Sequence, residues 1–372
     1  MTQIISVSCK LVVTPEYSQE IDETLERFAQ GCNYALKVAR RDNIRSANPL
    51  QKATYHDIRA MTGLKANHTC QAVRRVSTAL KGQKQVHTFR PTSLSLDVRT
   101  FSLKQRDWTV GITLLVGRRW FKLSLGSYQY GLLKGQEPTS AVLVKRKNGD
   151  YYIQIQVEIP TQPKGKTPKV IGVDLGRRDV AHTSTGKNWD GGVVQRTRAK
   201  YFRVRRSIQR RRTRASRRLL RRLSGKERRF QKNINHTISS QLVKLAKTLN
   251  HALALEDLTG IRQRTKVRRT QRREHHGWAF YQLRQFLTYK CNIAGVPLFL
   301  VNPAYTSKTC SRCHHIGSRQ SKDFKCGHCG LHVDADWNGA VNISTLGATL
   351  ARPEIPGMSC LLQGQLPLVC AA

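Results

Sequence analysis

Three acidic positions lie where short apolar runs end or where a helix is expected to begin, and a carboxylate at such a place can reach a metal ion. Asp174 and the acid pair Glu256–Asp257 each follow a run typical of a buried strand, and Asp336 lies at the expected helix start. A charge at the end of a buried strand costs free energy unless it is paired or metal-bound. Carboxylate oxygens suit Mg²⁺ or Mn²⁺, and two such ions about 4 Å apart can support phosphodiester hydrolysis.

Each acid also has an ordinary structural interpretation. Asp174 can cap the turn after its strand, Glu256 can form a salt bridge to one of the many arginines, and Asp336 can serve only as a helix N-cap. The functional hypothesis rests on the set, because three acids at element ends in a basic chain can converge on divalent metal.

Two cysteine pairs lie between the second and third acids. Cys310 and Cys313 form one C-x2-C pair and Cys326 and Cys329 form another, with twelve residues between the pairs. Four thiolates at this spacing complete one tetrahedral, structural zinc site that is closed to substrate. Redox use of a C-x2-C pair is the rival interpretation, and two matched pairs favour zinc. A nearby histidine could replace one cysteine: His314, His315, His328 or His332.

The whole chain is strongly basic. Its 372 residues include 65 Lys and Arg against 23 Asp and Glu, which gives a formal charge of +42 at pH 7. Such a surplus favours nucleic acid as a partner. High charge can also indicate disorder, but 39% of the residues are hydrophobic, enough for a folded core. The cysteine-rich segment carries basic side chains suited to a nucleic-acid strand: Lys308, Arg312, Arg319, Lys322 and Lys325.

The densest basic segment is Arg196–Lys232, with 18 Lys and Arg in 37 residues and one acid, Glu227. Its leucine spacing predicts a long helix or a pair of helices that continues into the amphipathic segment Ile234–Leu249. A solvated or disordered face is the ordinary interpretation of such a run. We favour a helix that follows a phosphate backbone, because neutralised phosphates release counterions.

The sequence gives no indication of secretion or membrane insertion. Met1–Val13 has no basic region before its apolar residues, so a signal peptide is not expected. The longest apolar tract, near Gly295–Val301, is too short to cross a bilayer. We therefore expect a cytoplasmic protein with no membrane partner, whose cysteines are reduced thiols or metal ligands. Six cysteines lack paired spacing: Cys9, Cys32, Cys70, Cys291, Cys360 and Cys370.

The first 160 residues have the pattern of helices inserted into a β-rich domain. Gln3–Val13 has strand character, and Thr14–Pro15 is a typical helix start. A second helix is expected over His68–Leu80 and strands over Thr88–Pro160, after which residues 161–169 have linker composition. The first helix has one apolar face: Ile21, Leu25, Phe28, Cys32 and Leu36.

Five motifs, in order, resemble those of TnpB, the accessory protein of a bacterial insertion-sequence family and a relative of the miniature type V CRISPR effectors. They cover Val170 to Ile343 and read Gly172-Val-Asp174-Leu-Gly176, Leu255-Glu256-Asp257-Leu258, Thr306-Ser-Lys-Thr-Cys310-Ser-x-Cys313, Cys326-x-x-Cys329 and Asp336-x-Asn338-Gly-Ala-x-Asn342-Ile343. The first half of the chain resembles the family only in its layout.

The resemblance implies an α/β fold with an RNase H-like RuvC nuclease domain interrupted by a zinc ribbon. A β-barrel wedge domain with a helical recognition insert would precede it. The expected boundaries are 1–14 and 86–165 for the wedge, 15–85 for the insert, 166–304 and 333–347 for the nuclease, 305–332 for the ribbon and 348–372 for a tail.

The resemblance also implies the activity and the site. Asp174, Glu256 and Asp336 match the catalytic, metal-binding acids of the family, and the spacing to Asn338 selects Asp336 over its neighbour Asp334. Family members use a guide RNA from the end of their own element and cut both strands of a DNA target. The implied cofactors are one structural Zn²⁺ at Cys310, Cys313, Cys326 and Cys329 and two catalytic Mg²⁺ or Mn²⁺ ions. Gly339, where the family often has Ala, and Arg177–Arg178 are departures that remove no ligand.

Three alternatives stay open at this point. A guided repressor that no longer cuts would share the charge and the zinc ribbon but is expected to lose an acid. A guide-independent RuvC-type nuclease would share the acids but has no need of the first 160 residues. A ribosome-associated basic zinc protein would not need the acid triad. Segment Arg262–Arg273, which precedes His275 and Trp278, is either a lid over the site or a surface loop.

Overall fold

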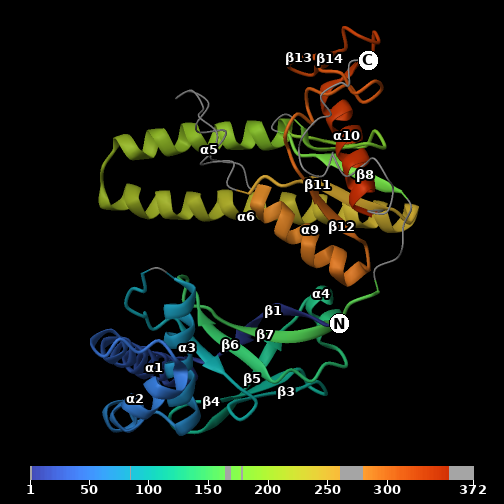
Figure 1. Ribbon diagram of the computed structural model, residues 1–372. Helices are drawn as coiled ribbons and strands as arrows, with labels where there is room; N and C mark the ends of the chain where they lie inside the picture. Colours follow the sequence, from blue (N-terminus) through green and yellow to red (C-terminus); the bar gives the residue numbers. More distant parts are fainter. Residues whose placement is uncertain (1, 84, 164–168, 177–178, 260–279, 352–372) are drawn as a thin grey trace. The chain divides into compact units, whose positions relative to one another are not determined.

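The computed structural model describes residues 2–83, 85–163, 169–176, 179–259 and 280–351 (Figure 1). Segment 262–273 with His275 and Trp278, Arg177–Arg178, most of the linker and the tail beyond Ala351 lie outside these ranges. The chain divides into two compact units, Thr2–Ile159 and Pro160 onward. In the described part of the chain, no helix combines the length and the apolar character needed to cross a membrane.

The N-terminal unit is one seven-stranded sheet with a three-helix insertion. The insertion follows the first strand, and the strand order is β2-β6-β7-β1-β5-β4-β3. In this order β2 and β3 are the two edge strands and are not paired with each other. The closed barrel that the resemblance implies therefore stays a proposal. The elements are β1 (Thr2–Val12), α1 (Pro15–Arg41), α2 (Ala47–Thr62), α3 (Ala66–Gly82), β2 (Ser93–Leu96), β3 (Phe101–Lys104), β4 (Thr109–Thr113), β5 (Arg118–Ser124), α4 (Ser127–Leu133), β6 (Ser140–Lys145) and β7 (Tyr151–Pro160).

Apolar periodicity explains most of these elements. All five residues of the predicted apolar face of α1 are buried, and in β7 the side chains of Ile153, Ile155 and Val157 are buried in alternation with polar residues. The pattern does not predict α2, because two of its four buried positions are threonines, Thr54 and Thr62. Each threonine hydroxyl donates to the carbonyl oxygen four residues earlier, which makes its burial possible.

The C-terminal unit is built on a five-stranded sheet of order β10-β9-β8-β11-β12. β8, β11 and β12 are parallel, β9 is antiparallel to β8, and β10 is antiparallel to β9. A separate three-stranded sheet, β13-β14-β15, follows. The elements are β8 (Val170–Asp174), β9 (Asp179–Thr183), β10 (Asn188–Asp190), α5 (Gly192–Arg210), α6 (Arg214–Leu249), β11 (Ala252–Glu256), α9 (Phe280–Ala294), β12 (Leu298–Val301), β13 (Ser318–Gln320), β14 (Asp323–Lys325), β15 (His332–Asp334) and α10 (Ala335–Ala351).

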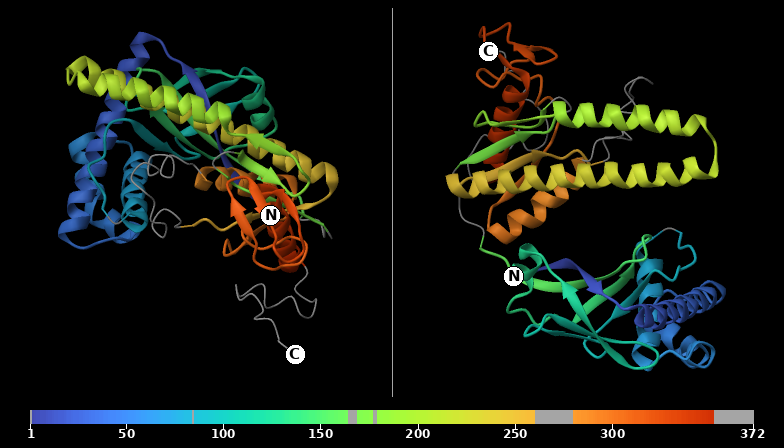
Figure 2. Two further views of the ribbon diagram at one scale, coloured as in Figure 1. Left: turned by 90° about the horizontal axis from the view of Figure 1, so that it is seen from above. Right: turned by 180° about the vertical axis from the view of Figure 1, so that it is seen from behind.

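The basic segment forms the predicted pair of helices. α5 and α6 lie side by side as a long hairpin, joined by a short turn at residues 211–213 (Figures 1 and 2). The end of α6 packs on the sheet through Ile238, Leu242 and Ala246, whereas most arginines of both helices are exposed. The hairpin therefore extends a large positive surface from the sheet.

The two faces of the central strands have different partners. Ile171 and Val173 of β8, with Leu253 and Leu255 of β11, pack against α6 and α9. The alternate residues, among them Val170 and Ala254, pack against α10. Since side chains alternate along a strand, Asp174 and Glu256 lie on the α10 side of the sheet.

Glycines allow α10 to approach this face closely. A Cβ at Gly172 would lie 1.9 Å from the carbonyl oxygen of Ala340, and one at Gly347 would lie 2.5 Å from the Cβ of Ala254. The first contact involves backbone, which cannot rotate away. The distance between β8 and α10 therefore depends on the missing side chain at residue 172.

Gly172→Ala should destabilise the C-terminal unit by about 3 kcal/mol, because α10 must move off β8. Chemical denaturation of the full chain, with hydrogen exchange of peptides from β8 and α10, measures the effect. Gly225→Ala is the matched control, because Gly225 lies inside α6 with only the end of Arg229 near its added Cβ. That control should stabilise by about 0.5–1 kcal/mol. Equal stabilities for the two variants would contradict the packing argument.

Candidate active site and cysteine cluster

Three acids from separate elements meet at one place on the α10 side of the sheet. Asp174 ends β8 and Glu256 ends the neighbouring parallel strand β11, where Leu255 pairs with Val173. Asp336 is the second residue of α10 and only 6% exposed. One turn further along the helix, a Cβ added at Gly339 would lie 3.3 Å from Asp174 Oδ2.

The proximity of these acids changes their protonation. Burial, followed by the charges of Glu256 and Asp336, raises the pKa of Asp174 to about 8. Burial also raises the pKa of Glu256, although a hydrogen bond from Thr306 and the charge of Arg319 act in the opposite direction. Burial likewise raises the pKa of Asp336, against the charge of Arg319. Ionisation of all three acids therefore costs free energy that a bound cation would offset.

Two of the three ordinary interpretations do not describe these acids. Asp334 Oδ1 accepts the backbone N–H groups of Asp336 at 2.8 Å and Trp337 at 2.9 Å, so Asp334 caps this helix and Asp336 does not serve only as an N-cap. At the second acid pair, Asp257 forms the salt bridge, at 2.6 Å to Arg284. Glu256 instead accepts a hydrogen bond from Thr306 Oγ1 at 2.5 Å.

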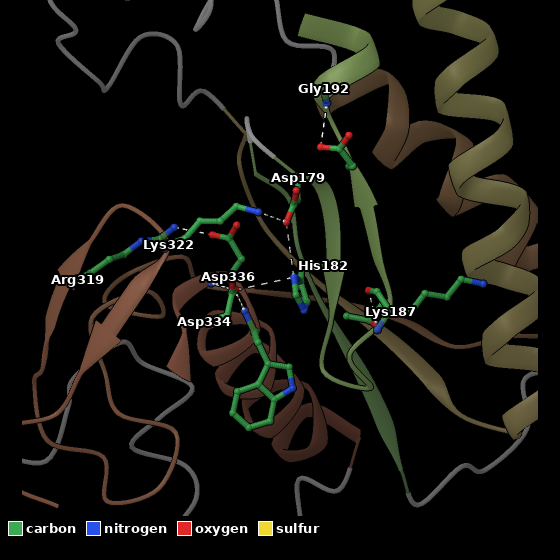
Figure 3. Close-up of polar contacts among 11 residues, drawn as sticks. Asp179, His182, Lys187, Gly192, Arg319, Lys322, Asp334 and Asp336 are labelled. Atoms are coloured by element: carbon green, nitrogen blue, oxygen red, sulfur yellow. Dashed lines mark hydrogen bonds and ion pairs between the residues drawn. The ribbon is translucent and has the colours of Figure 1, made fainter. Parts of the chain in front are cut away.

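Two cations from the cysteine-rich segment reach the acid cluster. Arg319 of β13 donates from Nη2 to Asp336 Oδ1 at 2.6 Å, and Lys322, just before β14, donates to Asp179 Oδ2 at 2.8 Å (Figure 3). From the sequence, both were expected only to contact nucleic acid, and no pattern connected them with the acids. The available signal was the insertion of this segment between the second and third acids, which returns its last strand to the start of α10.

A second layer of polar residues lies beside the acids. His182 of β9 is directly opposite Asp174 in the β8–β9 pairing, and Asp179 is 3% exposed. His182 Nδ1 lies 3.9 Å from Asp179 Oδ2 and 4.0 Å from Asp334 Oδ1 (Figure 3). No sequence pattern indicates this layer, because it depends on strand register.

Buried amides attach α10 to the chain that enters the cysteine cluster. Asn338 accepts the N–H of Ser311 at 2.9 Å and donates to the carbonyl of Thr309 at 2.7 Å. Asn342 donates to the carbonyls of Thr306 at 2.8 Å and Thr309 at 2.7 Å. The asparagines of the last motif thus hold Asp336 and the cysteine-rich segment in a fixed relation.

The four paired cysteines form one cluster. Sγ of Cys310 lies 3.6 Å from that of Cys329, Sγ of Cys313 lies 3.5 Å from that of Cys326, and all four lie within 4.8 Å of one another. Four thiolates around zinc, with Zn–S distances of about 2.3 Å, would be about 3.8 Å apart. Backbone N–H groups of Cys329 and His328 lower the pKa of Cys326 to about 6, which favours a thiolate. The cluster is therefore compatible with a zinc site.

Histidines lie beside this cluster. Cys313, His315 and His328 could also group around an ion, and the two imidazoles stack with centroids 3.7 Å apart. Four of the remaining cysteines lie elsewhere in the fold and two lie outside the described residues: Cys9, Cys32, Cys70 and Cys291, then Cys360 and Cys370.

A cavity of about 520 Å³ opens beside Asp336. Its lining includes three cationic side chains, Lys308, Arg319 and Lys322, together with Gly176 and two serines. An anion that entered this cavity would contact these three cations and lie beside Asp336. Such an arrangement suits a phosphodiester held next to carboxylate-bound cations.

Comparisons with known proteins agree with this picture. Residues 280–343 match the family model described as Cas12f1-like, TNB domain. The chain is 30% identical to the CRISPR-associated endodeoxyribonuclease Cas12f1 of Sulfoacidibacillus thermotolerans over 57% of this chain and 54% of that protein. It is 27% identical to the TnpB-like protein MJ0751 of Methanocaldococcus jannaschii over 47% of this chain and 67% of that protein. The match spans about half the length of the Cas12f1 relative.

The fold gives a similar result. A cryo-EM structure of a Cas12f1-sgRNA-target DNA complex superposes with a TM-score of 0.67 over 90% of this chain and 83% of that chain, at 14% sequence identity. At this identity the likeness concerns the mixed α/β fold. With the motif order and the matched domain, it confirms that this chain resembles the TnpB proteins and their Cas12f relatives.

Proposed function

We propose that this protein is an RNA-guided, divalent-metal-dependent DNA endonuclease of the TnpB type, associated with an insertion-sequence element. The observation that carries the proposal is the convergence of Asp174, Glu256 and Asp336 at one place, with raised pKa values and a cation-lined cavity beside them. The names of the relatives, which include a CRISPR-associated endodeoxyribonuclease, support the nuclease class.

The sheet order supports an RNase H-like RuvC domain as part of this proposal. The antiparallel pair β9 and β10 extends the sheet on one side of β8, and the parallel strands β11 and β12 extend it on the other. Asp174 and Glu256 stand at the ends of β8 and β11. We propose residues 166–304 and 333–347 as this domain and 305–332 as the zinc ribbon. Residues 1–14 and 86–165 would be the wedge, with 15–85 as its helical insert.

The acid cluster fits hard divalent cations. Its donors are carboxylate oxygens, the type of ligand that Mg²⁺ and Mn²⁺ prefer, and burial together with mutual repulsion favours binding of positive charge. Asp174, Glu256 and Asp336 would hold these ions. When bound, the ions would supply activation of water and stabilisation of the leaving oxygen.

The chain's own residues orient the substrate and the ligands. Thr306 fixes the Glu256 carboxylate by its hydrogen bond, and Asp334 fixes the start of α10 beneath Asp336. The Arg319 guanidinium forms an ion pair with Asp336 and also lines the cavity. Its remaining N–H groups can donate hydrogen bonds to a phosphate oxygen there. Lys322 pairs with the buried Asp179 of the second layer.

The proposed partners are a guide RNA from the end of the element and a double-stranded DNA target. A formal charge of +42 and the exposed arginines of the α5–α6 hairpin suit more phosphate than one duplex presents. The Cas12f1 structure of similar fold was determined with an sgRNA and target DNA, which supports both partners. All three acids are present, which favours a nuclease over a guided repressor.

Asp174→Ala should abolish cleavage of a DNA target matched to the RNA that copurifies with the protein, while RNA binding stays unchanged. The variant removes a metal ligand and leaves the RNA-binding surfaces intact. Cleavage is followed on gels and RNA binding by filter retention. Asp323→Ala, at an acid of β14 whose side chain is 74% exposed, is the matched control and should cut normally. Guided cutting by the Asp174 variant would refute the site assignment.

The stability of the protein without divalent cations should fall as pH rises from about 4 to about 8. The pKa of Asp174 rises from 3.8 in its ordinary state to about 8 here, so the folded state binds more protons than the unfolded state within this window. Asp174→Asn removes the titrating group and should flatten this decline. Denaturation at several pH values, without added Mg²⁺, measures it. A variant with the same decline as the wild type would contradict the cause proposed here.

Zinc should be present at one ion per chain, measured by elemental analysis of the purified protein. Cys326→Ser should lower this content by at least about half, since it removes one of four thiolate ligands. Cys70→Ser is the control, because Cys70 lies in α3 outside the cluster. A zinc content unaffected by the Cys326 change would exclude the cluster as the binding site.

A further inference from the structure

One exposed aromatic side chain of the N-terminal unit is held in an unusual way. Trp120 lies on β5, is 40% exposed, and stands directly opposite Gly111 of β4. A Cβ at Gly111 would lie 3.1 and 3.2 Å from two indole carbons and 2.7 Å from Ser102 Oγ. The indole therefore extends over the bare backbone of the adjacent strand.

Packing against the core does not account for this tryptophan. Its neighbours on β5, Phe121 and Arg119, point to the other face, where Phe121 is buried against Tyr17. Ser102 Oγ, which is buried close to Gly111, has no hydrogen-bond partner among the described residues. A tryptophan selected for burial would cover apolar side chains, whereas this one lies beside glycine and serine and stays 40% exposed.

Basic side chains share the face of the sheet that carries the indole. Lys104 Nζ lies 3.7 Å from the centroid of the Trp120 ring. Lys122 lies two residues after Trp120 on β5. It is opposite Thr109 of β4, which is itself opposite Lys104 of β3, so Trp120, Lys122 and Lys104 share one face of the sheet. Arg118 is on the same face, two residues before Trp120, and is exposed. Aromatic surface with adjacent positive charge suits a base with its neighbouring phosphates.

A second aromatic site adjoins Lys122. A cavity of about 420 Å³ has Lys122, Trp108 and Tyr130 in its lining. The two rings lie 5.0 Å apart at 52°, and Trp108 has a φ of 52°, in the left-handed region that bulky residues seldom adopt. Lys122 thus lines the second aromatic site and lies two residues after Trp120 on β5, so that a cationic side chain is close to both aromatic positions.

We propose that this surface, made by Trp120, Lys104, Lys122, Trp108 and Tyr130, binds unpaired nucleotides of an RNA, with one base stacked on Trp120. The inference rests on the proposed function, which supplies the RNA. Bases within a DNA duplex are already stacked on one another and cannot reach an indole on an open sheet. Loops and bulges of a folded RNA present bases that can.

The test measures binding of fluorescent oligoadenylate RNA to the full chain by anisotropy. Trp120→Ala should weaken this binding about tenfold, the loss expected from one base–aromatic stack, and Trp120→Phe should restore it to within about twofold. Duplex RNA should bind both variants as it binds the wild type. Tyr281→Ala is the control, since Tyr281 is 66% exposed on α9 in the other unit.

Equal affinities of Trp120→Ala and wild type for oligoadenylate would overturn the proposal, as would an equal loss for duplex RNA. Oligodeoxyadenylate is the second arm, and a larger loss for DNA than for RNA would reject the assignment to RNA. Guided DNA cleavage by the wild type is measured in parallel. Its absence would count against the proposed function, whereas intact cleavage with unchanged RNA affinity would remove only the stacking site.

Discussion

The burial of three neighbouring carboxylates is the constraint around which the C-terminal unit is organised. Asp174 has a pKa of about 8 because burial and two neighbouring acids disfavour its charge. No local rearrangement within β8 can relieve this, since the strand is fixed by pairing on both sides. The relief comes from cations, at present Arg319 on Asp336 and Lys322 on Asp179. Because the chain has a formal charge of +42, basic side chains are abundant near the acids.

Bringing the acids together requires a close contact between a helix and a strand. Asp336 belongs to α10, and α10 reaches β8 only because residue 172 lacks a side chain. The same contact leaves Gly339 beside Asp174, with 3.3 Å between an added Cβ and the carboxylate oxygen. An alanine there would need the carboxylate to shift by a few tenths of an ångström. Gly339 therefore gives the Asp174 side chain more room than the alanine often present at this position in the TnpB family.

The sequence predicted those features that depend on local pattern. Apolar runs predicted β8 and β11, strand alternation places their terminal acids on one face, and paired cysteines predicted a cluster that the structure brings together. Contacts between distant segments were beyond such patterns. The pairing of Arg319 with Asp336 depends on where a hairpin returns, and the choice of Asp334 as helix cap depends on the direction of a few N–H groups. The two threonines buried in α2 concealed that helix for a different reason, because a hydroxyl can be satisfied by its own helix.

The cysteine cluster and the acid site are connected through Arg319 and through the hydrogen bonds of α10. Arg319 lies between the two cysteine pairs, on a hairpin whose Phe324 is fully buried among Cys310, Cys326 and Ala335. Asn338 and Asn342, on the helix that carries Asp336, hold the chain just before Cys310. The guanidinium is thus fixed at both ends of its segment, by the cluster and by the helix. A long cationic side chain on a free loop would lose much conformational entropy on binding a phosphate, whereas one held in this way has already lost it. A structural ion at the cysteines would therefore contribute to the chemistry by holding Arg319 in place, without ever contacting substrate.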